Sequence, residues 1–357
     1  MVESDRKPHW DGLETTTEQE GFLAMKLNLT LACGLYDRTM ALQTGSVSPE
    51  GINLNYLIMN NPGELFKRQA RYAEFDVSEF SLSTHAILHT RDDRRMVGIP
   101  VFPSRRFRHS DIYVNTSAGI REPKDLVGKK VGTMSFQLTA AVWIRGILEH
   151  DYGVRGDQIE WYFGGYNEPM NYTERIPIKL PPNVRTKNVS DRSLDQMLES
   201  GEISALIGAF PPRCFQSEST KVARLFPNYQ EVELDYYRRT GIFPIMHMIV
   251  IKREIYEKSP WVAVSLCKAF ARAKAVGLRR LEYTASLFCS LPWLGLHLQE
   301  SRKQMGRDPF PYGIEENRQG LETLLEYSYE QGLISQRLKL EELFAPETLG
   351  GVDLIEI

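Results

Sequence analysis

The side chains most able to bind an anion or transfer a proton gather in the segment Arg105–His109. Three arginines and a histidine surround a single phenylalanine there, and β-type runs flank the segment on both sides. Guanidinium groups bind carboxylates through paired N–H donors, and an imidazole exchanges protons near neutral pH. We interpret the segment as a strand end leading into a functional connection, with Arg105, Arg108 and His109 as candidates. A solvated basic loop would show the same composition.

Two further segments place polar side chains directly after predicted strands. A strand over residues 26–32 is followed by a Gly-containing turn, and a strand over 75–82 runs into a group of hydroxyls. Ligands bind at such strand ends in open α/β sheets, and hydroxyls beside the N–H groups of a helix start suit a carboxylate. Ordinary helix capping uses the same residue types. The candidates in these segments, and before a predicted helix over 140–150, are Tyr36, Arg38, Ser81, Ser83, His85, Gln137 and Thr139.

A further imidazole lies in the long apolar run 241–251. His247 is flanked there by Met246 and Met248. It is a candidate for proton transfer at neutral pH. A lone histidine in an apolar strand also occurs as a hydrogen-bonded core residue, so both interpretations stay open.

The length and composition exclude several classes of protein. The chain has 357 residues, enough for two ordinary domains, and its apolar and charged fractions (42% and 25%) are those of a globular protein. A formal net charge of −3 argues against a dedicated nucleic-acid binder, so any anion site must be local. No stretch approaches the roughly 20 apolar residues that a membrane span needs.

The cysteines and the first residues predict a cytoplasmic location. The four cysteines are far apart and form no CxxC pair, as expected of a reduced protein. The run Thr30–Cys33 is similar to a lipoprotein cleavage site, but the residues before it are acidic where a secretory signal would be basic. We expect residues 1–24 to form a flexible extension.

The order of the predicted elements favours an α/β protein with two lobes. The predicted strands are 26–32, 52–57, 75–82, 97–102, 112–114, 159–163, 203–207 and 241–251, and the predicted helices start at 61 or span 140–150, 194–199, 261–281 and 315–330. Two crossover segments, near residues 105 and 245, would form a hinge beside a ligand cleft. We therefore expect one lobe of residues 25–105 plus 248–357 and a second lobe of residues 106–247.

Several long runs carry a family resemblance. The sequence resembles 4,5-dihydroxyphthalate decarboxylases in LTLACGLYDRT (29–39), FDVSEFSLS (75–83), IPVFPSRRFRHSDIYVN (99–115) and PYGIEENRQGLETLLEYSYEQGL (311–333). The resemblance spans nearly everything after Met25 and implies a two-lobed fold like that of type II periplasmic binding proteins. It also implies a cytoplasmic enzyme of bacterial phthalate breakdown that forms protocatechuate and CO2 and needs no organic cofactor. The acidic N-terminal extension departs from the family. The aperiodic segment 164–188 is expected to be a loop that partly covers the cleft, and differences there would alter the ring substituents accepted.

The implied reaction makes specific demands on side chains. Its substrate would be a small aromatic dianion with two adjacent carboxylates, which arginines are well shaped to hold. The ring carbon must receive a proton as CO2 leaves, and the hydroxyl para to the leaving group must be hydrogen-bonded or deprotonated. The expected catalytic residues are therefore His109, His247 and Arg105, with Arg108 and the strand-end candidates named above as the substrate-binding residues.

Two alternatives stay open. A non-catalytic cytoplasmic binding protein or sensor for an aromatic carboxylate could use the same lobes and arginines, because a fold does not fix function. A divalent metal ion could assist the reaction by binding the substrate diol, but no ligand cluster at zinc-like spacing supports it. We expect no metal site, no cofactor and no nucleic-acid or membrane partner, and the oligomeric state, a homo-oligomer included, is left open.

Overall fold

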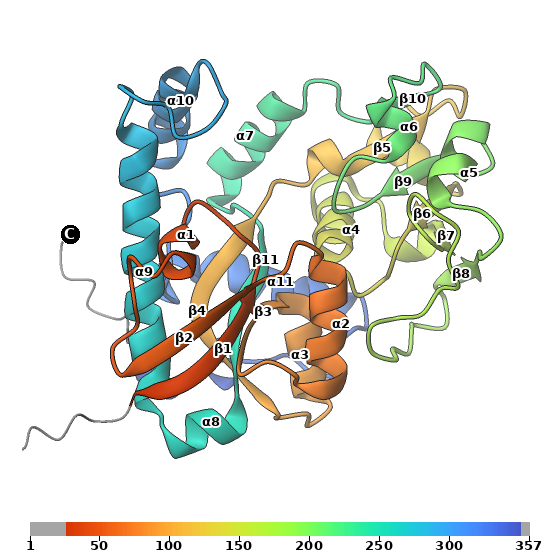
Figure 1. The fold of residues 1–357 in the computed structure, drawn as a ribbon. Helices are drawn as coiled ribbons and strands as arrows, with labels where there is room; N and C mark the ends of the chain where they lie inside the picture. Colours follow the sequence, from red (N-terminus) through yellow and green to blue (C-terminus); the bar gives the residue numbers. More distant parts are fainter. Residues whose placement is uncertain (1–25, 351–357) are drawn as a thin grey trace, which may run out of the picture.

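The computed structural model describes residues 26–350 and contains two β-sheets (Figure 1). The strands of the first sheet are β1 (Leu27–Cys33), β2 (Ile52–Ile58), β3 (Val77–Ser81), β4 (Met96–Arg105) and β11 (Ile245–Lys252). They lie in the order β2-β1-β3-β11-β4. Strands β1, β2 and β3 are parallel, whereas β11 is antiparallel to its neighbours β3 and β4.

The second sheet is built from the middle of the chain. Its strands are β5 (Ile112–Asn115), β6 (Lys130–Thr133), β7 (Glu160–Phe163), β8 (Arg185–Asn188), β9 (Ala205–Ile207) and β10 (Val222–Arg224). They lie in the order β10-β5-β9-β6-β7-β8. The chain thus passes from the first sheet to the second between β4 and β5 and returns to the first sheet in β11, as the predicted crossovers require.

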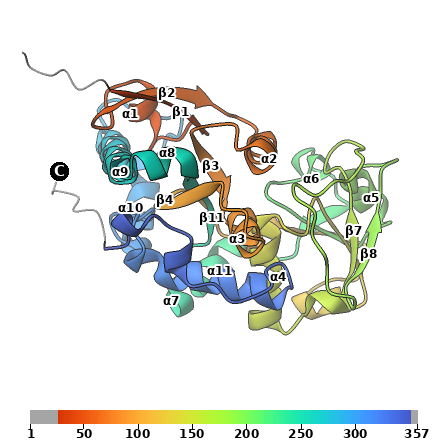
Figure 2. The same ribbon diagram turned by 90° about the horizontal axis from the view of Figure 1, so that it is seen from below.

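Helices surround both sheets (Figures 1 and 2). Helix α9 lies along the side of the first sheet that faces away from the second lobe, whereas α2, α3 and α4 lie between the two sheets. The helices are α1 (Met40–Gln43), α2 (Pro62–Tyr72), α3 (Leu82–Thr90), α4 (Thr139–Tyr152), α5 (Leu194–Ser200), α6 (Arg213–Gln216), α7 (Tyr229–Thr240), α8 (Arg253–Lys258), α9 (Trp261–Glu282), α10 (Leu294–Met305) and α11 (Arg318–Glu330).

Local capping signals explain where the helices beside the first sheet begin. The side chain of Asn61 accepts a hydrogen bond from the backbone N–H of Glu64, and Pro62 occupies the first turn of α2, where its missing N–H costs nothing. Ser81 ends β3 and caps α3 in the same way through the N–H of Thr84. The turn from β3 into α3 therefore needs no connecting loop, and it fixes the side chains at that strand end.

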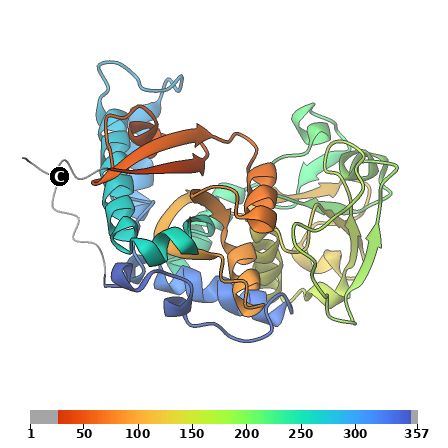
Figure 3. The same ribbon diagram turned by 60° about the horizontal axis from the view of Figure 1, so that its bottom comes forward.

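One hydrophobic core connects the two lobes. Buried residues from α2, α3, α4, β5, β9 and α11 belong to a single apolar cluster. In its centre, Trp143 of α4 packs edge-on against Tyr327 of α11, with 5.7 Å between ring centroids, and donates a hydrogen bond to the carbonyl of Ile245 in β11. Helix α11, blue in Figures 2 and 3, runs along the first lobe and packs against α4 where the two lobes meet.

Most of the predicted elements are confirmed, with boundaries shifted by a few residues. The expectations missed the helices α6, α7, α8 and α10 and the strand β10, and they missed β8, which lies inside the segment predicted to be a loop. The extension expected at residues 1–24 lies outside the described residues, and the exact lobe boundaries stay predictions. Between residues 26 and 350, no helix is both long enough and apolar enough to cross a membrane.

The packing of α4 against α11 predicts opposite effects for two Gly→Ala substitutions. A Cβ on Gly146 would lie 2.0 Å from Cδ2 of Tyr327, whereas a Cβ on Gly295 in α10 would have no neighbour nearer than 3.8 Å. We expect Gly146→Ala to lower the free energy of unfolding by about 1–3 kcal/mol through overpacking. Gly295→Ala should leave it unchanged or raise it by up to roughly 1 kcal/mol, because Ala favours the helix. Urea unfolding of both variants tests this, and equal stabilities would contradict the packing argument.

Candidate active site

His247 and Glu79 form a hydrogen-bonded pair at the carboxyl end of β3. His247 lies directly opposite Ser81 in the antiparallel pairing of β11 with β3, and Glu79 projects from the same face of β3 because it is two residues from Ser81. The Nδ1–H of His247 donates to Oε1 of Glu79 at 2.6 Å. The Glu79 side chain is 1% exposed and that of His247 is 17% exposed. Within residues 26–350, Nε2 of His247 forms no hydrogen bond, so this nitrogen is available to a ligand.

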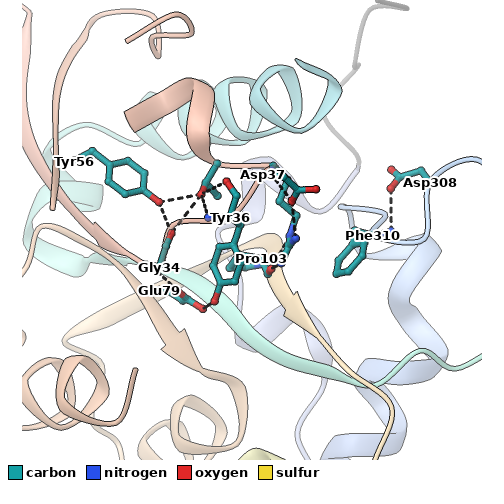
Figure 4. A network of polar contacts seen from close by, with 10 residues as sticks. Gly34, Tyr36, Asp37, Tyr56, Glu79, Pro103, Asp308 and Phe310 are labelled. Carbon is teal, nitrogen blue, oxygen red and sulfur yellow. Dashed lines mark hydrogen bonds and ion pairs between the residues drawn. The ribbon is translucent and has the colours of Figure 1, made fainter. Parts of the chain in front are cut away.

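The carboxylate of Glu79 receives further donors from the turn after β1 (Figure 4). The hydroxyl of Tyr36 donates to Oε1 at 2.7 Å, and the backbone N–H of Gly34 donates to Oε2 at 2.8 Å. Tyr56 closes the other side of the turn by donating to the carbonyl of Gly34 at 2.6 Å. The turn therefore fixes both oxygens of Glu79.

These donors determine the charge of Glu79. Burial alone would raise the pKa of its carboxyl, but the hydrogen bond and the charge of His247, followed by the donors Gly34 and Tyr36, outweigh burial and lower the pKa to about 2. Burial and the Glu79 charge raise the pKa of Tyr36, so its hydroxyl stays protonated. Glu79 is thus an ionised carboxylate that orients the imidazole and favours the tautomer with a proton on Nδ1.

Arg38 lies next to this cluster but has its own partners. Its guanidinium lies between the rings of Tyr36 and Phe310, with 4.4 and 4.3 Å to the two centroids. It donates to the carbonyl of Pro103 and forms an ion pair of 2.9 Å with Asp37. The charge of Arg38 is therefore largely balanced within the turn.

A group of hydroxyls joins the two lobes beside the pair. Thr139, the first residue of α4, has its Oγ1 2.9 Å from the hydroxyls of both Ser81 and Ser83. The hydroxyl of Ser83 also donates to the carbonyl of Gln137 at 2.7 Å. The structure thus brings together Ser81, Ser83, Gln137 and Thr139, although their hydrogen bonds to one another are those of a structural junction.

The segment predicted to cover the cleft contributes a cation to this region. The guanidinium of Arg175 lies over the ring of Phe66, with 5.0 Å to its centroid, and donates to the hydroxyl of Thr84 at 2.6 Å. The same Phe66 ring packs edge-on against His247, with 4.7 Å between centroids. Arg175 and His247 therefore both contact the ring of Phe66.

The neighbouring Glu174 occupies the helix start at which we expected a substrate carboxylate. Its carboxylate accepts hydrogen bonds from the backbone N–H of Phe136 at 2.9 Å, from Nε2 of Gln137 at 2.6 Å and from the hydroxyls of Ser135 and Tyr172. A carboxylate of the chain itself thus occupies the place before α4 where we expected a carboxylate of the substrate.

Comparisons with known proteins decide the family. The chain is 38% identical over 325 residues to 4,5-dihydroxyphthalate decarboxylase of Comamonas testosteroni, covering 91% of this chain and 98% of that protein. It is 38% identical over 221 residues to 4,5-dihydroxyphthalate decarboxylase of Pseudomonas putida, covering 62% of this chain and 85% of that protein. The chain belongs to the 4,5-dihydroxyphthalate decarboxylase family. This is a family of carboxy-lyases, and the resemblance in the sequence is confirmed. No protein-family model matches the chain.

Solved structures confirm the expected fold of this decarboxylase family member. The periplasmic aliphatic sulphonate binding protein SsuA from Escherichia coli superimposes with a TM-score of 0.52 at 12% identity, covering 90% of this chain and 98% of that one. The ligand-binding component of an ABC-type import system from Staphylococcus aureus gives a TM-score of 0.51 at 10% identity, covering 92% and 100%. The fold is therefore the two-lobed type II periplasmic-binding-protein-like fold.

The structure does not bring His109 to the His247 cluster of this decarboxylase family member. Its imidazole is buried among the rings of Tyr152, Phe226 and Tyr236, and neither ring nitrogen has a hydrogen-bond partner within the described chain. Burial, followed by the charge of Arg239, lowers the pKa of His109 to about 4. A neutral imidazole enclosed by aromatic rings does not support the expected role in proton transfer.

The arginines of the same segment are engaged in the crossover. Arg105 donates to the carbonyls of Phe243 and Pro311 and to the side chain of Asn317, which joins β4 to two distant segments. Arg108 is 4% exposed and forms an ion pair of 2.8 Å with the buried Asp111. Both arginines therefore hold the crossover together, which corresponds to neither a solvated loop nor a free anion site.

His85 likewise has a partner outside the cluster. It is 4% exposed, and its Nε2 lies 3.2 Å from the carbonyl of Leu343. Burial lowers the pKa of His85 to about 4. This position does not support a contact with substrate.

Sequence reasoning missed Glu79, Phe66 and Arg175. The sequence did contain a clue to Glu79, because a carboxylate in the middle of an apolar strand is seldom buried without a partner. The sequence contained no such clue to Arg175, since the segment around it has no periodicity. Within residues 26–350, no three side chains of His, Cys, Asp or Glu converge as a set of metal ligands.

Proposed function

We propose that this protein decarboxylates 4,5-dihydroxyphthalate to protocatechuate, with His247 as the proton donor. Membership of the decarboxylase family supports the reaction class and the substrate. The single observation that carries the assignment of the site is the 2.6 Å hydrogen bond between the ionised Glu79 and Nδ1 of a partly exposed imidazole. Such a pair holds the imidazole ring in place and leaves its Nε2 free to contact a ligand.

The proposed reaction follows from the electron demand of the ring. The hydroxyl para to one carboxylate supplies electron density to the carbon that carries this carboxylate, and Nε2 of His247 delivers a proton to that carbon. The C–H bond forms, the C–C bond to the carboxylate then breaks, and its electron pair restores the aromatic ring as CO2 leaves. His247 regains a proton from solvent, which its partial exposure permits. Glu79 balances the charge of the His247 ring while that ring carries both protons, and it remains ionised throughout.

We further propose that the reaction needs no organic cofactor and belongs to phthalate breakdown in the cytoplasm. Free cysteines support a reducing compartment, since Cys33, Cys214 and Cys267 are buried as thiols and Cys289 is an exposed thiol. Within the described chain, these four cysteines form no disulfide.

The direct test is CO2 release by the purified protein from 4,5-dihydroxyphthalate, with phthalate as the control substrate and with and without EDTA. We expect turnover of the dihydroxy compound alone, unaffected by the chelator. Binding of both compounds without CO2 release would instead identify a receptor for aromatic carboxylates. Activity that EDTA abolishes and Mg²⁺ or Mn²⁺ restores would show that a divalent metal takes part.

A further inference from the structure

We propose that Arg175 binds the carboxylate that the substrate retains and that Glu174 positions Arg175 for this task. The inference rests on the proposed function for the identity of the substrate. It goes beyond that function by assigning the cation that recognises the dianion and the segment that supplies it. We call residues 172–177 the strap.

The first argument is the place of the Arg175 guanidinium. It lies over the ring of Phe66, which packs at a steep angle against the imidazole of His247. It also donates to the hydroxyl of Thr84, which in turn lies 3.0 Å from the hydroxyl of Ser81, the residue opposite His247 in the sheet. Phe66 thus contacts both groups, and the hydroxyls of Thr84 and Ser81 place Arg175 near the strand end that pairs with His247.

The second argument is charge. Across residues 26–350, Arg175 forms no ion pair, whereas Arg38 is paired with Asp37 and Arg108 with Asp111. Thr84 uses one of the five N–H donors of Arg175, so paired donors remain for a carboxylate. Burial lowers the pKa of Arg175 to about 10, which leaves the guanidinium protonated at neutral pH.

The third argument is the way the strap is held. Glu174 is fixed at the start of α4 by the N–H of Phe136 and the amide of Gln137. The strap is also held at its other end, because Arg91, the residue that follows α3, donates to the carbonyl of Pro177. Glu174 therefore binds the second lobe while the adjacent Arg175 points to the first, so the strap spans the two lobes beside His247.

The loss of CO2 favours a contact of Arg175 with the carboxylate that the substrate retains. An ion pair to the departing carboxylate would stabilise the ground state more than the transition state and would slow the reaction. An ion pair to the neighbouring carboxylate holds the ring in place without opposing the loss of CO2.

The test measures phthalate binding by titration calorimetry alongside turnover of 4,5-dihydroxyphthalate. The variants are Arg175→Gln, Arg175→Lys and Glu174→Gln, and the matched control is Arg185→Gln, which removes an exposed arginine on β8. Thermal unfolding of each variant checks that it is folded. Phthalate binding needs no catalysis, so the binding measurement tests the role of Arg175 even if the proposed reaction is wrong.

We expect Arg175→Gln to raise the dissociation constant for phthalate by about 10- to 100-fold, the range for loss of a charge-assisted contact. Arg175→Lys should lie between Arg175→Gln and the wild type, and Arg185→Gln should match the wild type. In turnover, KM should rise more than kcat falls. An unchanged dissociation constant in a folded Arg175→Gln protein, or a wild type that does not bind phthalate, would overturn the proposal.

A double substitution tests the positioning role of Glu174. If Glu174 acts only through Arg175, Glu174→Gln weakens phthalate binding in the wild type but has no further effect in Arg175→Gln. Additive losses would show that Glu174 acts independently, and this would remove it from the proposal. If the wild type binds phthalate but does not release CO2 from the dihydroxy compound, the reaction is wrong while the assignment of Arg175 stands on binding alone.

Discussion

Replacing His247 by Asn is expected to lower kcat for 4,5-dihydroxyphthalate by about 10²–10⁴-fold, the usual contribution of a positioned acid or base. Asn preserves a hydrogen bond donor near Glu79 but has no group that can deliver a proton at neutral pH. The affinity for phthalate should change little, because the proposed role of His247 lies in the chemical step and not in holding carboxylates. Initial rates of CO2 release and calorimetric binding measure the two effects separately.

His297→Asn is the matched control, because it removes an exposed imidazole in α10. Wild-type turnover in the His247→Asn protein would exclude His247 as the proton donor. A loss confined to phthalate affinity would make it a binding residue.

Replacing Glu79 by Gln is expected to reduce kcat by roughly 10²-fold. Gln keeps the shape of the side chain, but its single carbonyl oxygen cannot accept from both Tyr36, which donates to Oε1, and Gly34, which donates to Oε2. The substitution also removes the charge that balances a protonated His247. The amide NH2 of the Gln side chain can also face the Nδ1–H of His247, and two donors in contact would turn the imidazole ring away. Steady-state kinetics should show the loss in kcat, with Asp76→Asn, another carboxylate on the first lobe, as the control.

Glu79 also predicts how stability depends on pH. Its pKa in the folded protein is about 2, below the ordinary value of 4.5, so the folded state favours the ionised form. The stabilisation is therefore fully present above about pH 4.5 and is lost as the pH falls toward 2. We expect the difference in unfolding free energy between wild type and Glu79→Gln to be largest at neutral pH and to shrink between pH 4.5 and 2. A difference that stays constant over this range would contradict the depressed pKa of Glu79.

The fold was largely accessible from sequence because its elements carry strong local signals. Strand β1 has alternating apolar residues, and Asn61-Pro62 marks the start of α2 by capping chemistry. Helices α7 and α10 were missed because their sequences are mostly polar and only their tertiary contacts hold them. Strand β8 was missed for a related reason, since its four residues are exposed and are defined by pairing with β7.

The candidate site could be predicted from the sequence only in part, because the partners of its side chains depend on long-range packing. His247 was identified by its residue type, but its partner Glu79 is 168 positions away and meets it only through the β3–β11 pairing. The cluster at residues 105–109 was the most conspicuous feature of the sequence, yet its arginines bind carbonyls and Asp111 at the crossover. Charge density in sequence thus marked a crossover whose arginines already have partners within the chain, whereas Arg175 emerged only from its contacts.

The hydrophobic core that α4 and α11 share has a consequence for how the molecule melts. Since Trp143 and Tyr327 belong to one apolar cluster that includes residues of both sheets, unfolding of one lobe would expose part of the buried surface of the other. Heating should therefore give a single calorimetric peak, with equal van't Hoff and calorimetric enthalpies, in place of one peak for each lobe. The mutual orientation of the lobes then depends on the shared core, and loss of that core would separate Ser81 from Thr139.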